Sequence, residues 1–224
     1  MYFKRAIETD AEKIMEIIEQ AQRYFRDNGI DQWQNNYPNA DVVMNDIKNE
    51  NNYVLVKSGN IISTAVVSFE GEETYGTIYS GSWAGSGRYA VIHRMAVESS
   101  LKGNGLAGLM IHNIEMLCRK AGIQSIRVDT HKDNMSMQKM LTKNSFKYCG
   151  IIFLRDGSER LAFEKLLASS VVSVTGQDAS TGQDAPTGHS APTGQDASTG
   201  HSAPTGHGAP TGQDAPTGQD ALNT

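Results

Sequence analysis

Hydrophobic residues recur at two different spacings along residues 1–168, and each spacing predicts a different backbone. Apolar side chains three and four positions apart predict amphipathic helices, whereas short alternating or continuous apolar runs predict strands. Helical spacing marks residues 10–28, 41–49, 104–120 and 134–144. Strand patterns mark residues 2–7, 53–57, 61–69, 89–97, 123–130, 146–154 and 159–167.

The order of these segments predicts the fold class. It runs as a strand, two helices, three strands, a helix, a strand, a helix and two strands. Such a mixture is typical of an α/β domain with a largely antiparallel sheet. Turn residues at Ser58-Gly59-Asn60 and Asp156-Gly157 favour two hairpins. Residues 70–88, rich in Gly, Ser and Glu, predict a loop with some strand content.

The pattern changes completely beyond residue 168. Residues 175–222 form eight hexapeptides of the type Thr-Gly-Gln-Asp-Ala-Pro. A hexapeptide period also occurs in β-helices, but that fold needs a large aliphatic side chain in each turn, and most of these units offer only alanine. Such a segment cannot bury enough apolar area to offset the entropy of ordering it. We therefore expect one domain over 1–168 and a disordered tail over 169–224.

Charge divides the chain at the same place. The 224 residues include 20 Lys+Arg and 25 Asp+Glu, for a formal net charge of -5. Five of the acids lie in residues 175–224, which contain no Lys or Arg, so the upstream part is formally neutral. A neutral domain lacks the basic excess of nucleic-acid-binding proteins. No apolar run approaches the roughly 20 residues of a membrane span. We expect neither nucleic acid nor membrane as a partner.

Cysteine and histidine are too few for a disulfide framework or a zinc site. The two cysteines are Cys118 and Cys149, and three histidines lie upstream of the repeats. The N-terminus has no apolar stretch like that of a signal peptide. We expect inert buried thiols, no metal and a reduced, cytoplasmic setting. A homodimer is one oligomeric state that the sequence allows.

The candidate functional residues lie at the end of a predicted strand and in the turn that follows it. His93-Arg94-Met95-Ala96-Val97 ends that strand, and Lys102-Gly103-Asn104-Gly105-Leu106-Ala107-Gly108 opens the next helix. Glycines let the backbone approach a ligand, and the unpaired N–H groups of a helix start bind phosphate oxygens. The run is neither a Walker loop nor a Rossmann fingerprint. An ordinary strand-to-helix turn is the alternative interpretation of the glycines alone.

This run resembles the acetyl-CoA motif of the GCN5-related N-acetyltransferase (GNAT) superfamily, [QR]-x-x-G-x-[GA]. Lys102, Gly105 and Ala107 match it, although Lys102 replaces the usual Gln or Arg. A second match runs from Asp129 to Asn134, and Ser145-Phe146 follows where Gly-Phe is usual. The resemblance covers roughly residues 2–167. It implies the GNAT-type acyl-CoA acyltransferase fold, a central mixed, mostly antiparallel sheet flanked by helices.

The same resemblance implies acetyl-CoA as the cosubstrate and direct attack by an amine in a ternary complex. It implies that the pantetheine arm pairs with the backbone at Met95, Ala96 and Val97 and that Asn134 hydrogen-bonds the arm. The pyrophosphate would rest on the amides of residues 102–108. A backbone N–H near Met95 would polarise the thioester carbonyl while the amine attacks.

The reaction needs a base for the amine proton and an acid for the CoA thiolate. His93 lies two residues before Met95, so strand alternation predicts that both side chains share a face. It resembles the base histidine of arylalkylamine-type members, and an ordinary imidazole pKa suits that role. A purely structural histidine is the alternative. The usual acid, a Tyr seven residues after the Asn, is replaced by Leu141. Tyr148, water or release of a thiolate remain as alternatives.

Two aromatic residues of a predicted loop bear on the identity of the acceptor. Trp33 and Tyr37 lie in the loop that shapes the acceptor pocket in this family, where they either contact substrate or pin the loop. The leading hypothesis is an acetyl-CoA-dependent N-acetyltransferase acting on a primary amine of a small molecule or peptide. The alternatives are acetylation of a protein N-terminus or lysine, and CoA binding with little catalysis.

Overall fold

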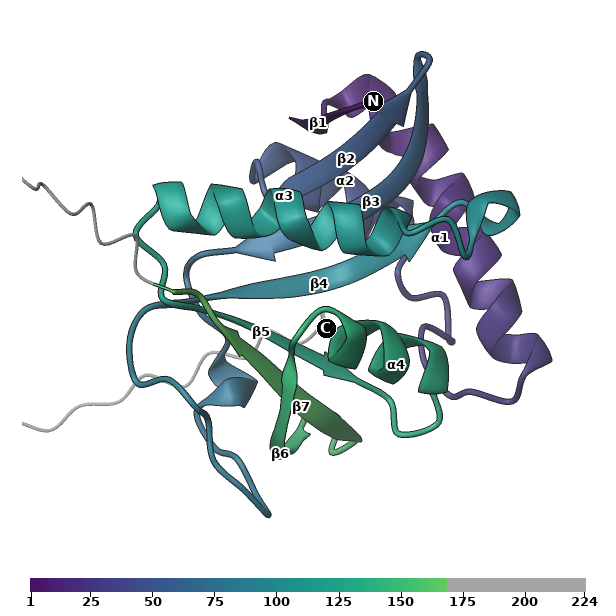
Figure 1. Ribbon diagram of the computed structural model, residues 1–224. Helices are drawn as coiled ribbons and strands as arrows, with labels where there is room; N and C mark the ends of the chain where they lie inside the picture. The colour runs from purple at the N-terminus through teal and green to yellow at the C-terminus, as the bar shows by residue number, and fades with distance from the viewer. Residues whose placement is uncertain (169–224) are drawn as a thin grey trace, which may run out of the picture. The chain divides into compact units, whose positions relative to one another are not determined.

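The computed structural model describes residues 1–168, which form a mixed α/β structure with one seven-stranded sheet (Figure 1). The strands are β1 (Tyr2–Arg5), β2 (Asn52–Lys57), β3 (Asn60–Ser68), β4 (Tyr89–Val97), β5 (Ser125–Thr130), β6 (Lys147–Phe153) and β7 (Glu159–Leu166). The helices are α1 (Ala11–Asp27), α2 (Ala40–Lys48), α3 (Leu106–Lys120) and α4 (Met135–Lys143). The fold class expected from the sequence is confirmed, while the tail predicted from residue 169 lies outside the described residues.

The sheet has the strand order β1-β2-β3-β4-β5-β7-β6. Five of its six strand pairs are antiparallel, and only β4 and β5 run parallel. The parallel pair is short, because its register covers only Tyr89–Val91 against Ser125–Arg127. The connection between these two strands is α3, as parallel strands require a crossover.

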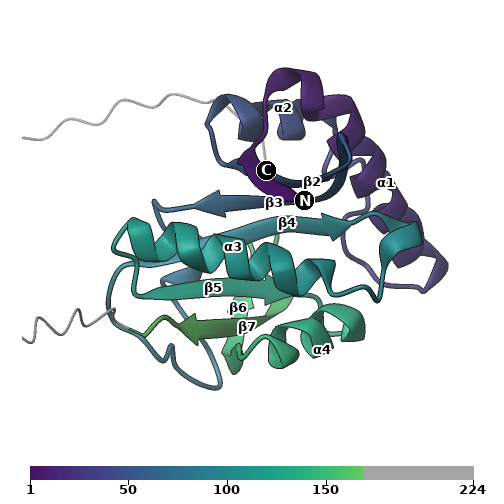
Figure 2. The same ribbon diagram turned by 45° about the horizontal axis from the view of Figure 1, so that its top comes forward.

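Helices cover both faces of the sheet and divide the core into two layers. On one face α1 and α2 bury Ile14, Ile17 and Val43 against Val54 and other apolar residues of the sheet. On the other face α3 and α4 contribute a larger cluster. Figures 1 and 2 show α3 and α4 together on one side of the sheet, with α1 and α2 across it. The helical spacings in the sequence therefore mark the buried faces of these helices.

Three short 3₁₀ turns lie between the helices and strands that the sequence predicts. Glu8–Asp10, Glu73–Tyr75 and Ser99–Leu101 each form such a turn. The third occupies part of the connection after β4, so α3 begins at Leu106 rather than at residue 104. Residues 70–88 contain only the second turn and a single bridge between Tyr79 and Ile151.

A buried ion pair anchors this long loop beneath the sheet. Arg127 Nε donates to Glu164 Oε1 over 2.9 Å, and the Ser125 hydroxyl donates to the same oxygen over 2.7 Å. The loop amides of Ala84 and Gly85 donate to the other carboxylate oxygen. The Arg127 guanidinium also lies over two aromatic rings, 4.2 Å from the centroid of Trp83 and 3.8 Å from that of Tyr89. These contacts fix the loop to the paired end of β4 and β5.

Candidate active site

The candidate site begins where β4 and β5 separate. Their ladder ends at Val91 and Arg127, yet β4 continues to Val97 and β5 to Thr130. Just after β4, the Glu98 N–H donates to the Ile62 carbonyl over 3.0 Å. Glu98, and Ala96 two residues before it, therefore direct their backbone polar groups toward β3. Because successive backbone groups of a strand point to opposite edges, the polar groups of Val97 face the opening. The sheet thus offers unpaired backbone groups along one side of β4.

A β-bulge interrupts β4 beside this opening. His93 stands opposite Val66 and Ala96 stands opposite Thr64, so Arg94 and Met95 together oppose Ala65. Arg94 adopts a left-handed backbone conformation, with φ of 47°. The extra residue shifts the alternation of the side chains that follow it.

The bulge overturns one prediction about His93. Ile92 packs in the α3-side core, and so do Met95 and Val97 beyond the bulge, whereas Ala96 packs in the layer of α1 and α2. His93 therefore points to the face opposite Met95. The expectation that the two side chains share a face is wrong because it assumed unbroken strand alternation. It lies on the face of the sheet that bears α1 and α2.

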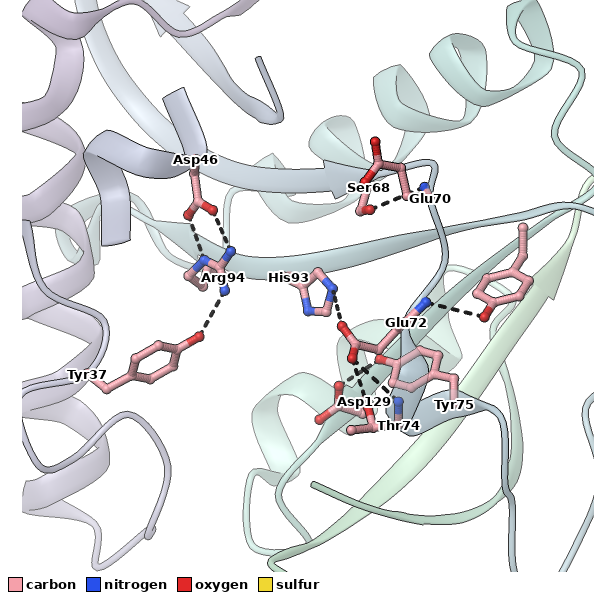
Figure 3. A network of polar contacts seen from close by, with 11 residues as sticks. Tyr37, Asp46, Ser68, Glu70, Glu72, Thr74, Tyr75, His93, Arg94 and Asp129 are labelled. Carbon is pink, nitrogen blue, oxygen red and sulfur yellow. Dashed lines mark hydrogen bonds and ion pairs between the residues drawn. The ribbon is translucent and has the colours of Figure 1, made fainter. Parts of the chain in front are cut away.

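The His93 imidazole lies beside a carboxylate in a mostly buried position. Its Nε2 atom is 3.6 Å from Glu72 Oε2, and its side chain is 22% exposed (Figure 3). Burial lowers the pKa of His93 from 6.5 to about 4, and the nearby Arg94 charge acts in the same direction. The ordinary imidazole pKa expected from the sequence is therefore wrong. The ring is neutral at pH 7, which is the form that accepts a proton, but it is a weaker base than a free imidazole.

Arg94 connects the bulge to the opposite layer. Its Nε and Nη2 atoms donate to the two Asp46 carboxylate oxygens over 2.7 and 2.6 Å, and Nη1 donates to the Tyr37 hydroxyl over 2.8 Å (Figure 3). Asp46 comes from α2, and Tyr37 comes from the loop that joins α1 to α2. Burial raises the pKa of Asp46, while the Arg94 guanidinium opposes that change.

The two aromatic residues predicted at the acceptor pocket both have contacts within the protein. The Tyr37 hydroxyl accepts the hydrogen bond from Arg94. The Trp33 ring packs edge-on against Phe25, with ring centroids 5.5 Å apart. These contacts are the ones that the loop-pinning interpretation requires. Trp33 also lines a cavity of about 550 Å³ between α1 and this loop, away from the separating strands.

The glycine-rich turn has a backbone that only glycine adopts easily. Gly103 and Gly105 have φ of 86° and 75°, and a Cβ on either would meet no atom within 4 Å. Gly105 precedes α3, whose first hydrogen bond runs from the Leu109 N–H to the Gly105 carbonyl over 3.0 Å. The amides of residues 106–108 precede that bond and so lack helical partners. The turn is thus suited to the pyrophosphate of acetyl-CoA.

Two further residues of the motif have structural contacts. Lys102 Nζ lies 4.1 Å from the ring centroid of Tyr24, as a cation–π pair. Gly108 lies inside α3, where a Cβ would come within 3.1 Å of Asn144 Oδ1. The absence of a side chain at Gly108 therefore lets α3 approach the end of α4.

Asn134 caps α4 at the end of the opening. Its Oδ1 accepts from the Met137 N–H over 3.1 Å, and its Nδ2 donates to Gln32 Oε1 over 2.9 Å. The contact with Gln32 joins α4 to the α1–α2 loop, and nothing in the local sequence indicates it. Among residues 1–168, Thr130 Oγ1 is the one buried side-chain polar atom that has no hydrogen-bond partner. It ends β5 beside the separated strands.

Candidate proton donors are scarce around the opening. Leu141 is 0% exposed and packs in the α3-side core. Tyr148 is half exposed and packs edge-on against Phe163. No motif in the sequence indicates Tyr75, whose hydroxyl donates to Asp129 Oδ1 over 2.6 Å (Figure 3). Burial raises the pKa of both groups of that pair.

Burial raises the pKa of Cys118 to about 12, which leaves the thiol protonated and unreactive. Within residues 1–168, no three metal-ligating side chains gather closely enough to hold an ion. In the same part of the chain, no helix combines the length and apolar character of a membrane span.

Comparison with known proteins agrees with this geometry. Residues 14–146 match the model of the acetyltransferase (GNAT) family. A GNAT-family acetyltransferase from Streptococcus agalactiae is 34% identical and superposes with a TM-score of 0.68, covering 74% of this chain and 94% of its own. One from Listeria monocytogenes, 17% identical, shares the fold with a TM-score of 0.58 over 74% of this chain and 94% of its own. Among curated proteins, none matches by sequence. The chain belongs to the GNAT family of acetyltransferases.

Proposed function

We propose that the protein is an acetyl-CoA-dependent N-acetyltransferase in which a primary amine attacks the thioester directly. The observation that carries the proposal is the separation of β4 from β5 beyond Val91 and Arg127. That opening leaves backbone polar groups of β4 unpaired at the same end of the sheet as the N-terminus of α3 (Figure 1). Bound acetyl-CoA would supply the activated acetyl group.

Backbone groups of the chain would bind and orient the cosubstrate. The amides of residues 102–108 would hold the pyrophosphate, because the positive φ of Gly103 and Gly105 exposes the first turn of α3. The backbone groups of Met95 and Val97 on the open edge of β4 would pair with the amides of the pantetheine arm. The expectation that Ala96 pairs with the arm is wrong, because its carbonyl accepts from the Ser63 hydroxyl and its backbone faces β3. A backbone N–H at the bulge would polarise the thioester carbonyl, and such donors are typically worth about 10²–10³ in kcat.

His93 is the proposed general base. An alkyl ammonium has a pKa of about 10 and must lose a proton before it attacks. The imidazole is neutral at pH 7, so it can accept that proton, and its Nε2 atom lies 3.6 Å from Glu72 Oε2. It shares a face with the α1–α2 loop that includes Trp33 and Tyr37, where the acceptor would bind. Since Leu141 cannot donate a proton, the CoA thiolate would be protonated by water.

The acceptor is proposed to be a primary amine of a small molecule or peptide. CoA release should be followed with polyamines, amino acids, aminoglycosides and N-terminal peptides, each at saturating acetyl-CoA. Intact proteins with free N-termini or lysines form the second arm of the screen. A preference for intact proteins would replace the small-molecule assignment with protein acetylation.

A matched pair of histidine variants tests the base. His93→Gln should lower kcat by roughly 10²-fold or more, while calorimetry gives an unchanged affinity for acetyl-CoA. His112→Gln, at an exposed position on α3, serves as the control and should keep normal kcat. Near-normal kcat in folded His93→Gln would exclude His93 as the base. Absence of acetyl-CoA binding by the wild-type chain would overturn the proposed function itself.

A further inference from the structure

We infer that the Asp46–Arg94–Tyr37 network is a positioning device that holds the β4 bulge in its left-handed conformation. Through the bulge, the network would direct the Met95 backbone N–H toward the thioester. It would also link that N–H to the α1–α2 loop that includes Tyr37 (the acceptor loop). Arg94 is a positioning residue in this scheme, because it acts through the backbone of its neighbour. The link to the thioester rests on the proposed function, whereas the control of the bulge does not.

The backbone of Arg94 is unusual for its place in the fold. Its φ of 47° lies in the left-handed region, which glycine adopts freely and other L-residues disfavour. The other non-glycine residues of positive φ in the described part of the chain lie in turns and loops. Arg94 alone has this conformation inside a strand. Bulges with a left-handed residue normally place glycine there.

The arginine side chain supplies the missing reason for this conformation. In an unbroken strand, residue 94 would share the face of Ala90 and Ile92, which pack in the α3-side core. Asp46 and Tyr37 lie across the sheet, on the side of α1 and α2 (Figure 3). Only the turned backbone brings the guanidinium to them. The ion pair and the bulge therefore depend on each other.

The network is well suited to hold the strand against strain. Its two hydrogen bonds to Asp46 are parallel and short, at 2.7 and 2.6 Å, as in bidentate pairs that fix both partners. The Arg94 and Asp46 side chains are only 17% and 9% exposed. A third hydrogen bond runs from the remaining nitrogen, Nη1, to the Tyr37 hydroxyl. Few other directions satisfy all three bonds together.

The bulge in turn determines what the open edge presents. It moves Met95 and Val97 onto the α3 side and places one additional peptide unit opposite Ala65. A strand without the bulge would present a different set of N–H and carbonyl groups to the opening. Because Tyr37 belongs to the acceptor loop, any shift of that loop would reach the bulge through Arg94.

Two double variants test the inference without leaving a buried charge. Asp46→Asn with Arg94→Gly and Asp46→Asn with Arg94→Ala both remove the ion pair, and they differ only by one methyl group. Glycine keeps the left-handed backbone accessible, whereas alanine disfavours it by about 5–30-fold in population. We therefore expect the glycine variant to recover at least fivefold more kcat than the alanine variant.

The position of the Met95 amide gives a readout that does not depend on activity. In ¹H–¹⁵N spectra of the full chain, the Met95 resonance should stay near its wild-type position in the glycine variant and move in the alanine variant. Thermal melts establish that both variants are folded. Equal kcat and equal Met95 shifts in the two variants would overturn the inference. If the wild-type chain releases no CoA, the proposed function fails while the spectra still decide whether Arg94 controls the bulge.

Discussion

A buried arginine–carboxylate pair lies beside each end of strand β4, and the two pairs have different structural roles. At Tyr89–Val91 the strand is paired with β5, and the neighbouring pair is Arg127–Glu164. Beyond Val91 the strand contains the bulge and is no longer paired with β5, and the neighbouring ion pair is Arg94–Asp46. The first pair holds loop, β5 and β7 together. The second draws one residue out of the strand toward α2.

The difference lies in the backbone that each pair joins. Glu164 accepts from Arg127, from Ser125 and from two loop amides, so its carboxylate replaces lost water with four donors. Neither Arg127 nor Glu164 has a positive φ. Arg94 has a positive φ, and its hydrogen bonds stabilise a backbone conformation that the strand alone would not adopt. The same kind of ion pair therefore stabilises the fold where β4 pairs with β5 (the closed end). Beyond Val91 (the open end) it determines the conformation of the backbone.

The largest effect on stability should follow from breaking the closed-end pair. Glu164→Gln removes the negative charge and leaves the Arg127 guanidinium buried without a counter-charge. Loss of one partner of a buried pair typically costs about 3–5 kcal/mol, and urea unfolding at pH 7 would measure the loss. Glu159→Gln, at an exposed position on the same strand, should change the free energy of unfolding by less than about 0.5 kcal/mol. A loss below about 1 kcal/mol for Glu164→Gln would show that the pair is not the anchor described.

The sequence alone predicts the closed end better than the open end. Apolar spacing locates α1, α3 and the strands because burial imposes it, and residues such as Ile14 and Ile114 reveal their faces directly. The bulge leaves no such mark, since no glycine stands at Arg94 and the conformation depends on Asp46, far away in the chain. Strand alternation consequently misplaced His93.

The contacts between distant segments at the candidate site, like the bulge, could not be predicted from the sequence. Glu72 beside His93 and Gln32 beside Asn134 both come from loops whose paths are set by tertiary packing. Local motifs nevertheless located the glycine turn, because its positive φ values are a local requirement that Gly103 and Gly105 meet. Residues with local causes are predictable, and residues with distant causes are not.

A smaller effect should appear at the open end as the pH falls. The pKa of His93 is about 4 in the folded chain against an ordinary value of 6.5. Between these values the unfolded chain binds a proton that the folded chain does not, so stability falls as the pH falls from 6.5 toward 4. At about 1.4 kcal/mol per pKa unit, the loss reaches roughly 3 kcal/mol below pH 4. Above pH 6.5 the group contributes no pH dependence.

The measurement compares wild type with His93→Gln by urea unfolding at several pH values. The variant should lose less stability than wild type on going from pH 7 to pH 4.5. Asp46 and Asp129 have pKa values raised by burial and contribute with the opposite sign, but both chains contain them and the difference cancels their effect. Parallel pH profiles for the two chains would contradict the burial of His93 as a neutral ring.

The smallest expected effect comes from alanine substitutions at the two ends of α3, which lie beside the two ends of β4. Gly105 precedes the helix at the open end, and Gly122 follows it at the closed end, where β5 begins. Their φ values are 75° and 69°, and a Cβ on either would meet no atom within 4 Å. Substitution of either by alanine should therefore cost the same backbone strain, on the order of 1 kcal/mol. Only Gly105→Ala alters the turn whose amides would hold pyrophosphate, and losing one hydrogen bond to a charged group corresponds to about a tenfold weaker affinity for acetyl-CoA. Calorimetric titration should thus separate two variants that urea unfolding does not, and equal affinities would remove the pyrophosphate from the Gly105 turn.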